Sequence, residues 1–397
     1  MSPLTVMLVA AEASGDALGA DLARALKAKL GDGVRFVGVG GARMAELGVA
    51  SPFDISQLSI LGLVEGLRAW PRVIRLADQT AALARREQPD VAVMIDSWGF
   101  SLRVAQRLRR QSPHLPLVKY VAPQVWASRP GRARTLAVTV DLLLSTQPMD
   151  APFFEREGLK TVFVGNPAVA REGTGDGARF RAVHGLGEDA PILLVLPGSR
   201  PGEVARMNDA LRDAGQRLVA ACPGLSVVIP VAETVTDQVR LLAADWPVPV
   251  MLVEGAGAKA DAINAATAAL ACSGTVTTEL AMAGCPMVVG YRVGALTHIA
   301  LKRLITTRYI TLFNIAAGQE IAREFVQDAC TGAALAAAAL PLLTDPAVRG
   351  AQVAAQTAAL DRMGRGGPDP SEQAAEAILQ LVRPKLLAVQ RLANSRS

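Results

Sequence analysis

The stretch Leu270–Tyr291, LACSGTVTTELAMAGCPMVVGY, indicates the fold of the chain. A short apolar run ends at Ser273-Gly274-Thr275, helical periodicity follows as far as Met282, and a second apolar run completes the stretch. This order predicts a strand, a turn, a helix and a strand, which is the repeating unit of an α/β protein.

The turn between the first strand and the helix has the features of a phosphate-binding site. A helix N-terminus offers unpaired N–H groups and a partial positive charge. Gly274 lets the backbone approach closely, and the hydroxyls of Ser273 and Thr275 add donors. Glu279 lies about one helical turn further on, where its carboxylate would meet ribose hydroxyls. An ordinary capped helix gives the same pattern, so this turn alone leaves both interpretations open.

A second turn of this kind follows the apolar run Ile192–Leu196. Pro197-Gly198-Ser199-Arg200 stands at its carboxyl end, which is where ligands of open α/β sheets bind. The planar guanidinium of an arginine can neutralise a diphosphate there. Two such turns in one half of the chain predict a site for a nucleotide diphosphate.

Length and composition limit the class of protein. A chain of 397 residues is too long for one ordinary core, so two domains are expected. The net charge of +5 (41 basic minus 36 acidic residues) suits an anionic substrate, an anionic membrane surface or nucleic acid. Aromatic residues make up only 4% and no basic run is interleaved with them, which argues against a nucleic-acid surface.

Cysteine, histidine and hydropathy patterns exclude several further classes. The 4 cysteines show no CxxC spacing and the 3 histidines lie far apart, so we expect reduced thiols, no metal site and no cofactor. No apolar run reaches the ~18 residues that a membrane-spanning helix needs. The start of the chain lacks the positive region of a signal peptide and predicts a first strand instead.

The order of apolar runs predicts two Rossmann-like parallel-sheet domains that face a cleft. We expect an N-terminal domain over residues 1–170, a linker over 171–190 and a C-terminal domain over 191–363, followed at 364–397 by a helix and basic tail that cross back to the first domain. The predicted strands are Leu4–Ala10, Val34–Val39, Val91–Ile95, Leu117–Val121, Leu142–Ser145, Thr161–Val164 and Ile192–Leu196, with others near Leu225, Val248, Ala269 and Met287.

Residues 58–70 crowd apolar side chains into a short stretch that is followed by arginines. A core helix with a solvated basic face and a helix lying on a membrane surface both fit this pattern. The residues of the candidate membrane contact are Leu63, Val64, Leu67, Arg68, Trp70 and Arg72.

Two turns of the first half also carry candidate residues. Asp96 follows the strand Val91–Ile95, where a carboxylate can serve as a general base or can cap the next helix. Gly15, in the turn after the first strand, fits either close packing or the approach of an acceptor phosphate.

Several longer motifs run in one order over nearly the whole chain. They are AEASGDALGADL (Ala11–Leu22), FVGVGGARM (Phe36–Met44), LSILGLVEGL (Leu58–Leu67), PDVAVMIDSWGF (Pro89–Phe100), YVAPQVWASRPGR (Tyr120–Arg132), LPGSRPGE (Leu196–Glu203), SGTVTTELAMAGCPMVVGY (Ser273–Tyr291), and TLFNIAAGQE with REFVQ (within Thr311–Gln327). Together they resemble the family of lipid-A-disaccharide synthases, which are inverting glycosyltransferases of the GT-B type.

The resemblance implies a reaction and its participants. UDP-2,3-diacylglucosamine would donate its sugar to 2,3-diacylglucosamine 1-phosphate, giving a β-1,6-linked disaccharide 1-phosphate and UDP, without a cofactor. It also implies a peripheral protein at the inner face of the cytoplasmic membrane of a Gram-negative-type bacterium. The oligomeric state stays open.

The resemblance further implies roles for individual residues. Asp96 matches the general base, Arg200 the arginine of the nucleotide site, and Asn314 a third catalytic residue. Trp98 and Gly99 depart from the family's IDAPDF pattern beside that base. The implied substrate and nucleotide site comprises Glu12, Ser14, Gly15, Gly198, Ser199, Ser273, Gly274, Thr275, Glu279 and Gln327.

Two other classes of function remain open from the sequence. One is a different GT-B enzyme that acts on a UDP-sugar, such as a UDP-N-acetylglucosamine epimerase or a peptidoglycan glucosaminyltransferase. The other is a non-catalytic protein that binds nucleotide or lipid. The products formed from a diacylated donor and acceptor distinguish these classes.

Overall fold

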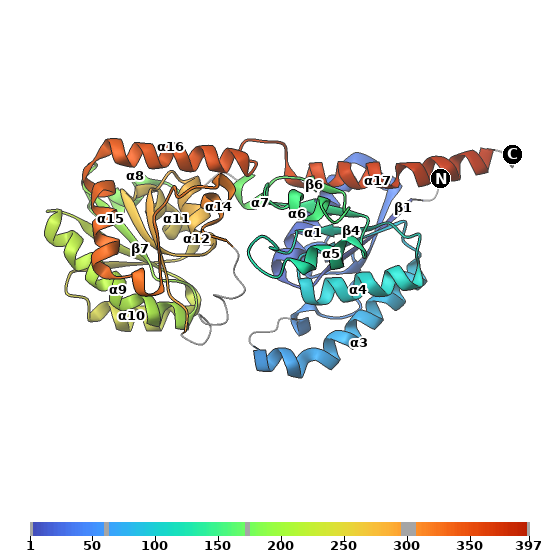
Figure 1. The fold of residues 1–397 in the computed structure, drawn as a ribbon, viewed down its shortest axis with the longest axis horizontal. Helices are drawn as coiled ribbons and strands as arrows, with labels where there is room; N and C mark the ends of the chain where they lie inside the picture. Colours follow the sequence, from blue (N-terminus) through green and yellow to red (C-terminus); the bar gives the residue numbers. More distant parts are fainter. Residues whose placement is uncertain (1–2, 59–62, 171–174, 295–306, 395–397) are drawn as a thin grey trace. The chain divides into compact units, whose positions relative to one another are not determined.

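The structure is a computed structural model that describes residues 3–58, 63–170, 175–294 and 307–394 (Figure 1). The chain divides into two compact units, one formed by Met1–Pro167 with Gly367–Ser397 and the other by Ala168–Gly366. Each unit contains a six-stranded sheet, and all hydrogen-bonded neighbours in these sheets run parallel. The prediction of two Rossmann-like parallel-sheet domains is confirmed.

The first sheet has the strand order β2-β1-β3-β4-β5-β6. Its strands are β1 (Leu4–Ala10), β2 (Val34–Val39), β3 (Val91–Ile95), β4 (Leu117–Tyr120), β5 (Leu142–Ser145) and β6 (Thr161–Phe163). Every residue of β1, β3, β4 and β5 is buried, as expected for parallel strands covered on both faces. The strand order reverses between β1 and β3, so the crevice at their carboxyl ends is the expected ligand position.

Helices cover both faces of this sheet. They are α1 (Ala13–Leu30), α2 (Ala42–Ala45), α3 (Leu63–Glu87), α4 (Trp98–Gln111), α5 (Gly131–Ala137), α6 (Ala151–Glu155) and α17 (Pro370–Asn394). Met7 and Val9 pack with α3 and α4 on one face, and Val6 and Leu8 pack with α1 and α17 on the other. Helix α17 lies against α1 in Figure 1, which confirms that the C-terminal helix crosses back to the first domain.

The second sheet has the strand order β12-β11-β10-β7-β8-β9. Its strands are β7 (Ile192–Leu196), β8 (Ser226–Val231), β9 (Val250–Glu254), β10 (Ala268–Cys272), β11 (Met287–Tyr291) and β12 (Glu324–Val326). Its helices are α8 (Gly177–Val183), α9 (Pro201–Ala221), α10 (Thr236–Ala244), α11 (Ala256–Ala265), α12 (Thr275–Met282), α14 (Leu312–Ala317), α15 (Gly332–Thr344) and α16 (Pro346–Arg362). The strand order reverses between β7 and β10, which again marks a ligand crevice.

The region expected as a linker is partly built into the second unit. Pro167–Ala170 forms the short helix α7, and residues 171–174 lie outside the described part of the chain. Helix α8 packs on α11, where the Arg179 guanidinium pairs with the Asp261 carboxylate at 2.6 Å. This ion pair fixes the segment that precedes β7.

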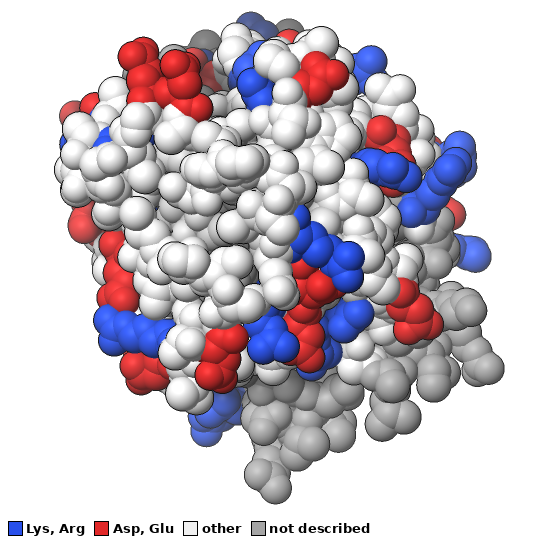
Figure 2. Space-filling view, turned by 90° about the vertical axis from the view of Figure 1, so that its left-hand side faces the viewer, with Lys and Arg blue, Asp and Glu red and all other residues white. Residues whose placement is uncertain are grey.

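Figure 2 shows a largely uncharged face at the end of the second unit where α9 and α15 lie in Figure 1. The thirteen residues of α15 include no charged side chain. Positive and negative side chains mix around the margin of this face. Within the described residues, no helix is long and apolar enough to span a bilayer.

Candidate functional site

A cavity of about 490 Å³ opens at the carboxyl edge of the second sheet. The turns that follow β7, β8, β9 and β10 line it, so it lies over the point where the strand order reverses. Of the predicted binding residues, the structure brings six together here: Gly198, Ser199, Arg200, Ser273, Gly274 and Thr275.

The turn after β7 is shaped by Glu203, which is almost fully buried. Its carboxylate accepts from the N–H of Ser199 at 3.2 Å and from the guanidinium of Arg200 at 2.7 Å. Gly198 has φ +117, and a Cβ there would lie 2.7 Å from the Cβ of Glu203, so the turn requires glycine. The Arg200 side chain is 76% exposed, so it can turn toward a bound anion.

The turn after β10 leads into α12 without a side-chain cap. Its first N–H groups are therefore available to an anion. Ser273 donates its hydroxyl to the carbonyl of Ile310 at 3.4 Å, and Thr277 donates to the carbonyl of Gly274 at 2.7 Å. Helices α9 and α11 also begin at this cavity without side-chain caps, so three helix N-termini make it attractive to an anion.

Lys259 is a cavity residue that the sequence patterns did not indicate. Its ammonium pairs with the carboxylate of Glu279, the predicted ribose ligand, at 2.6 Å. The pair joins α11 to α12 beside the cavity. Lys259 had no local sequence signal, because it lies within an ordinary alanine-rich helix.

The side chain of Asn314 is buried, and both the nitrogen and the oxygen of its amide form hydrogen bonds. It donates to the carbonyl of Ala322 and to the carboxylate of Glu324, both at 2.8 Å, and accepts from the N–H groups of Ile321 and Ala322. Glu324 in turn accepts from the N–H of Ile310 at 2.8 Å. This arrangement makes Asn314 a support of the segment that Ser273 contacts, and its catalytic role stays a prediction.

Gln327, another predicted binding residue, is also engaged with the backbone. Its amide oxygen accepts from the N–H of Val293 at 2.7 Å, and its amide nitrogen donates to the carbonyl of Val293 at 3.2 Å. It therefore joins the end of β12 to the segment after β11.

The first unit brings Glu12, Ser14 and Asp96 together at the reversal point between β1 and β3. The hydroxyl of Ser14 donates to Oδ2 of Asp96 at 3.4 Å. Burial and the charge of Asp96 raise the pKa of Glu12. Two neighbouring carboxylates suit a site in which one carboxylate takes up a proton.

Gly15 lies beneath this group and serves close packing. A Cβ at Gly15 would meet the Cβ of Ala10 at 3.3 Å and the carbonyl oxygen of Ile95 at 3.6 Å. The glycine therefore lets α1 approach the ends of β1 and β3.

Lys119 is the second functional candidate that the sequence patterns did not indicate. It belongs to β4, is 3% exposed and donates from Nζ to the backbone carbonyl of Asp96. A lysine within the apolar run LVKY was the only signal for it.

Two tryptophan–arginine pairs flank the start of α4. The guanidinium carbon of Arg132 lies 4.9 Å from the ring centroid of Trp98, and that of Arg103 lies 3.9 Å from the ring centroid of Trp70. Burial and the nearby charge of Arg129 lower the pKa of Arg132. Among the described residues, neither Arg129 nor Arg132 has a carboxylate partner in an ion pair, so this surface has positive charge available to an anion.

Helix α3 carries the candidate membrane contact. The side chains of Leu63, Val64, Leu67 and Arg68 lie outside the described part of the structure. Trp70 is 51% exposed and Arg72 is exposed, whereas Ala69, Val73 and Leu76 pack into the core. From residue 69 onward, α3 is an amphipathic helix with one core face.

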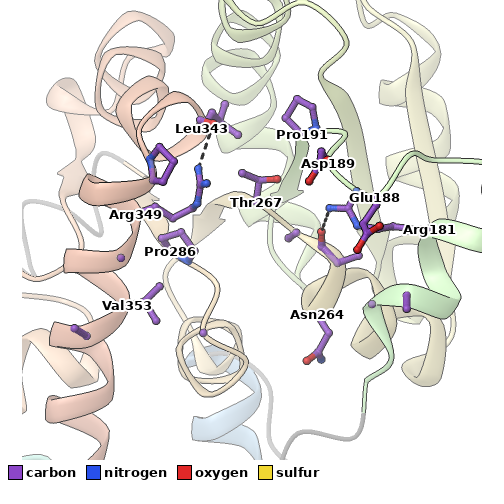
Figure 3. A pocket seen from close by; sticks show the side chains of 18 residues that line it. Arg181, Glu188, Asp189, Pro191, Asn264, Thr267, Pro286, Leu343, Arg349 and Val353 are labelled. Carbon is purple, nitrogen blue, oxygen red and sulfur yellow. Dashed lines mark hydrogen bonds between the residues drawn. The ribbon is translucent and has the colours of Figure 1, made fainter.

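A wider hollow of about 970 Å³ lies at the opposite, amino edge of the second sheet (Figure 3). Two arginines that line it are occupied by the chain itself. Arg181 donates to the carbonyls of Gly187, Ala190 and Ala265, and Arg349 donates to those of Leu342 and Leu343. Since ligands of open α/β sheets bind at the carboxyl edge, we assign the site to the smaller cavity.

Within the described residues, no group of three or more His, Cys, Asp or Glu side chains is arranged to hold a metal ion. The four cysteines are all buried, and burial raises the pKa of each thiol. Their thiolate forms are therefore disfavoured near neutral pH.

A family described as "Lipid-A-disaccharide synthetase" matches residues 6–378. The lipid-A-disaccharide synthase of Rhodospirillum centenum is 42% identical, with 98% of this chain and 97% of that protein covered. The protein of the same name from Pseudomonas aeruginosa is 41% identical, with 96% and 98% covered.

Solved structures show a similar fold at low identity. A co-structure of S. aureus MnaA with UDP matches with a TM-score of 0.60 and 14% identity over 96% of this chain and 97% of that one. MurG of Acinetobacter baumannii matches with a TM-score of 0.58 and 15% identity over 95% and 100%. These matches assign each unit to the Rossmann-like domains of the GT-B fold.

Proposed function

Because the chain belongs to the lipid-A-disaccharide synthase family, we propose that it joins UDP-2,3-diacylglucosamine to 2,3-diacylglucosamine 1-phosphate. The products are the β-1,6-linked disaccharide 1-phosphate and UDP. The observation that supports this reaction most strongly is the cavity over the β7–β10 reversal, where Arg200 and three uncapped helix N-termini gather.

This cavity is the proposed site of the donor's nucleotide diphosphate. Arg200 turns from Glu203 toward the diphosphate, and the turn Ser273–Thr275 presents N–H groups and hydroxyls to it. Glu279, oriented by Lys259, accepts from the ribose hydroxyls. The same groups stabilise the negative charge on UDP as it leaves, which lowers the barrier to transfer.

Asp96 is the proposed general base. The 6-hydroxyl oxygen of the acceptor attacks the anomeric carbon of the donor and the bond from that carbon to the phosphate oxygen breaks. The electron pair of the broken bond leaves on UDP, and Asp96 takes the hydroxyl proton. A single displacement of this kind inverts the anomeric centre, and no covalent enzyme intermediate is needed.

The arginines beside Trp98 suit the acceptor. Arg129 and Arg132 lie near the start of α4, the helix that follows Asp96, and their charges have no carboxylate partner among the described residues. A phosphate monoester such as the acceptor's 1-phosphate is the anion that the proposed reaction would bring there.

A UDP-release assay tests the reaction class. We expect UDP to form from UDP-2,3-diacylglucosamine only when the monosaccharide 1-phosphate is present. Interconversion of the sugar nucleotide without acceptor would favour an epimerase. Tight UDP binding without any release would favour a non-catalytic binding protein.

We expect transfer to continue unchanged in EDTA, because Arg200 and the helix N-termini meet the charge of the leaving UDP. The measurement is the initial rate of UDP formation with and without the chelator. Strong inhibition that added Mg²⁺ reverses would contradict a metal-free transfer.

We propose that the N-terminal part of α3 docks the protein on the inner face of the cytoplasmic membrane. Both substrates carry acyl chains, so the enzyme must meet them at a bilayer surface. Exposed Trp70 with Arg103 over its ring, and exposed Arg72, are suited to the headgroup boundary.

Replacing Leu63→Glu together with Val64→Glu tests this docking. If these side chains meet the membrane, the thermal midpoint stays nearly unchanged and sedimentation with anionic liposomes falls. The matched control is Val183→Glu with Leu241→Glu, because both side chains are 72% exposed in the other unit. A folded α3 variant that sediments like wild type would contradict the proposal, and a loss of several kcal/mol of stability would place the pair in the core.

A further inference from the structure

Lys119 is buried in the middle of the first sheet, beside the proposed base. It is 3% exposed, and its neighbours in β4 are Leu117, Val118 and Tyr120. Burying an ammonium group is strongly unfavourable unless polar partners compensate for the lost water. A lysine at this position therefore calls for a specific role.

The contacts of Lys119 converge on the backbone of Asp96. Nζ donates to the Asp96 carbonyl and, at 3.4 Å, to the Tyr120 carbonyl. The hydroxyl of Ser101 also donates to the Asp96 carbonyl at 2.9 Å, and the Asp96 N–H donates to the Tyr120 carbonyl at 2.9 Å. The backbone of Asp96 is thus held through both its N–H and its C=O.

The turn held in this way has an unfavourable backbone conformation. Asp96 has φ +49 and Ser97 has φ +37, although neither is glycine. Such a conformation is unfavourable for residues other than glycine, so it persists only where surrounding bonds fix it. Loss of the Lys119 bond would let the turn relax and displace the Asp96 carboxylate.

Charge links the same residues. Burial lowers the pKa of Lys119 to about 8, and attraction to Asp96 offsets part of that effect. The charged groups that act on this position are Asp96 after β3 and, through Asp96, Glu12 after β1. Lys119 is therefore a cation below about pH 8 and becomes neutral above it.

We propose that Lys119 is a positioning residue for sugar transfer: it fixes the Asp96–Ser97 turn and places a positive charge beside the carboxylate that accepts the proton. The inference rests on the proposed function, because it requires Asp96 to be the base. Lys119 itself is buried, so it would act through Asp96.

Lys119→Met tests the proposal, because methionine keeps an unbranched chain and removes the charge and the donor. We expect kcat to fall at least about tenfold while KM and UDP affinity stay within about twofold. The thermal midpoint should stay level or rise, since a buried charge is removed. A residue with a purely structural role would instead lower stability and leave kcat per folded molecule unchanged.

The pH profile gives an independent readout. In the wild type, kcat/KM should decline above about pH 8 as Lys119 loses its proton, and Lys119→Met should lack this decline. An unshifted profile with wild-type kcat would overturn the proposal.

Further variants separate this inference from the base assignment. Exposed Lys160→Met is the control and should behave as wild type. In an Asp96→Asn background, Lys119→Met should add less than about a twofold loss of kcat, because both residues act through one carboxylate.

The single variants separate the two hypotheses. An active Asp96→Asn protein rejects the base and the inference together. An inactive Asp96→Asn protein together with a fully active Lys119→Met protein rejects only the inference. If Lys119→Met fails to fold, Lys119→Gln takes its place, and failure of both to fold also rejects the proposal.

Discussion

Asp96→Asn is expected to lower kcat by about a hundredfold or more while UDP still binds normally. Asparagine has nearly the same shape but cannot accept the proton of the attacking hydroxyl. It also tolerates the positive φ of +49 at this position, so the turn should stay intact. The cavity proposed for UDP belongs to the other unit and keeps all its residues. Steady-state rates and calorimetric UDP titration measure the two effects separately.

The matched control is Asp78→Asn, the same substitution on the exposed face of α3, where Asp78 pairs with Arg107 at 2.6 Å. Loss of one exposed ion pair lowers the free energy of unfolding by only about 0–1 kcal/mol, so turnover should stay unchanged. Near-normal turnover in Asp96→Asn would reject Asp96 as the base. In that case Glu12, whose pKa is raised by burial and by Asp96, becomes the next carboxylate to test.

Arg200→Ala is expected to weaken UDP binding and slow transfer together, each by about ten- to a hundredfold. One guanidinium meets the diphosphate both in the bound donor and in the leaving group, so ground-state and transition-state binding should suffer alike. Arg200 is 76% exposed and its pair with Glu203 is a local one, so the fold should not depend on it. Calorimetry with UDP and initial rates of transfer measure the two losses.

Arg217→Ala provides the control for charge and exposure. Arg217 is 53% exposed and pairs with Asp213 on α9, so its removal also deletes one cation and one surface ion pair. It should leave UDP affinity and turnover unchanged. If Arg200→Ala shows unchanged UDP affinity and turnover, the cavity over the β7–β10 reversal is not the donor site.

The central strands were predictable because they are short, buried and parallel. Val91–Ile95 and Ile192–Leu196 have the predicted bounds, and every residue in them is buried. The strand predicted as Leu117–Val121 ends one residue earlier, because Val121 has φ +70. β12 gave no signal, since its three residues EFV become a strand only through pairing with β11.

The turns that surround the proposed sites were predictable from local sequence, whereas the side chains that organise them were not. A glycine-containing turn between an apolar run and a helix is a candidate phosphate position from local sequence alone, and two such turns in one half of the chain made it the favoured interpretation. Lys119 donates a hydrogen bond to a carbonyl 23 residues earlier in the chain. Lys259 of α11 pairs with a carboxylate of α12, and a strand separates these two helices in the sequence. Such partners meet only after the sheets have formed. The amide of Asn314 shows the reverse case, because its motif gave no sign that the chain itself uses all of its hydrogen bonds.

Mass spectrometry of the products formed from UDP-2,3-diacylglucosamine and 2,3-diacylglucosamine 1-phosphate tests the central claim most directly. The proposed transfer predicts one new species with the mass of the tetraacylated disaccharide 1-phosphate, formed in equal amount to UDP and absent when either substrate is omitted. Its anomeric configuration should be β, as inversion requires. Recovery of both substrates unchanged by an enzyme that binds UDP, or of an altered sugar nucleotide in place of the disaccharide, would contradict the account.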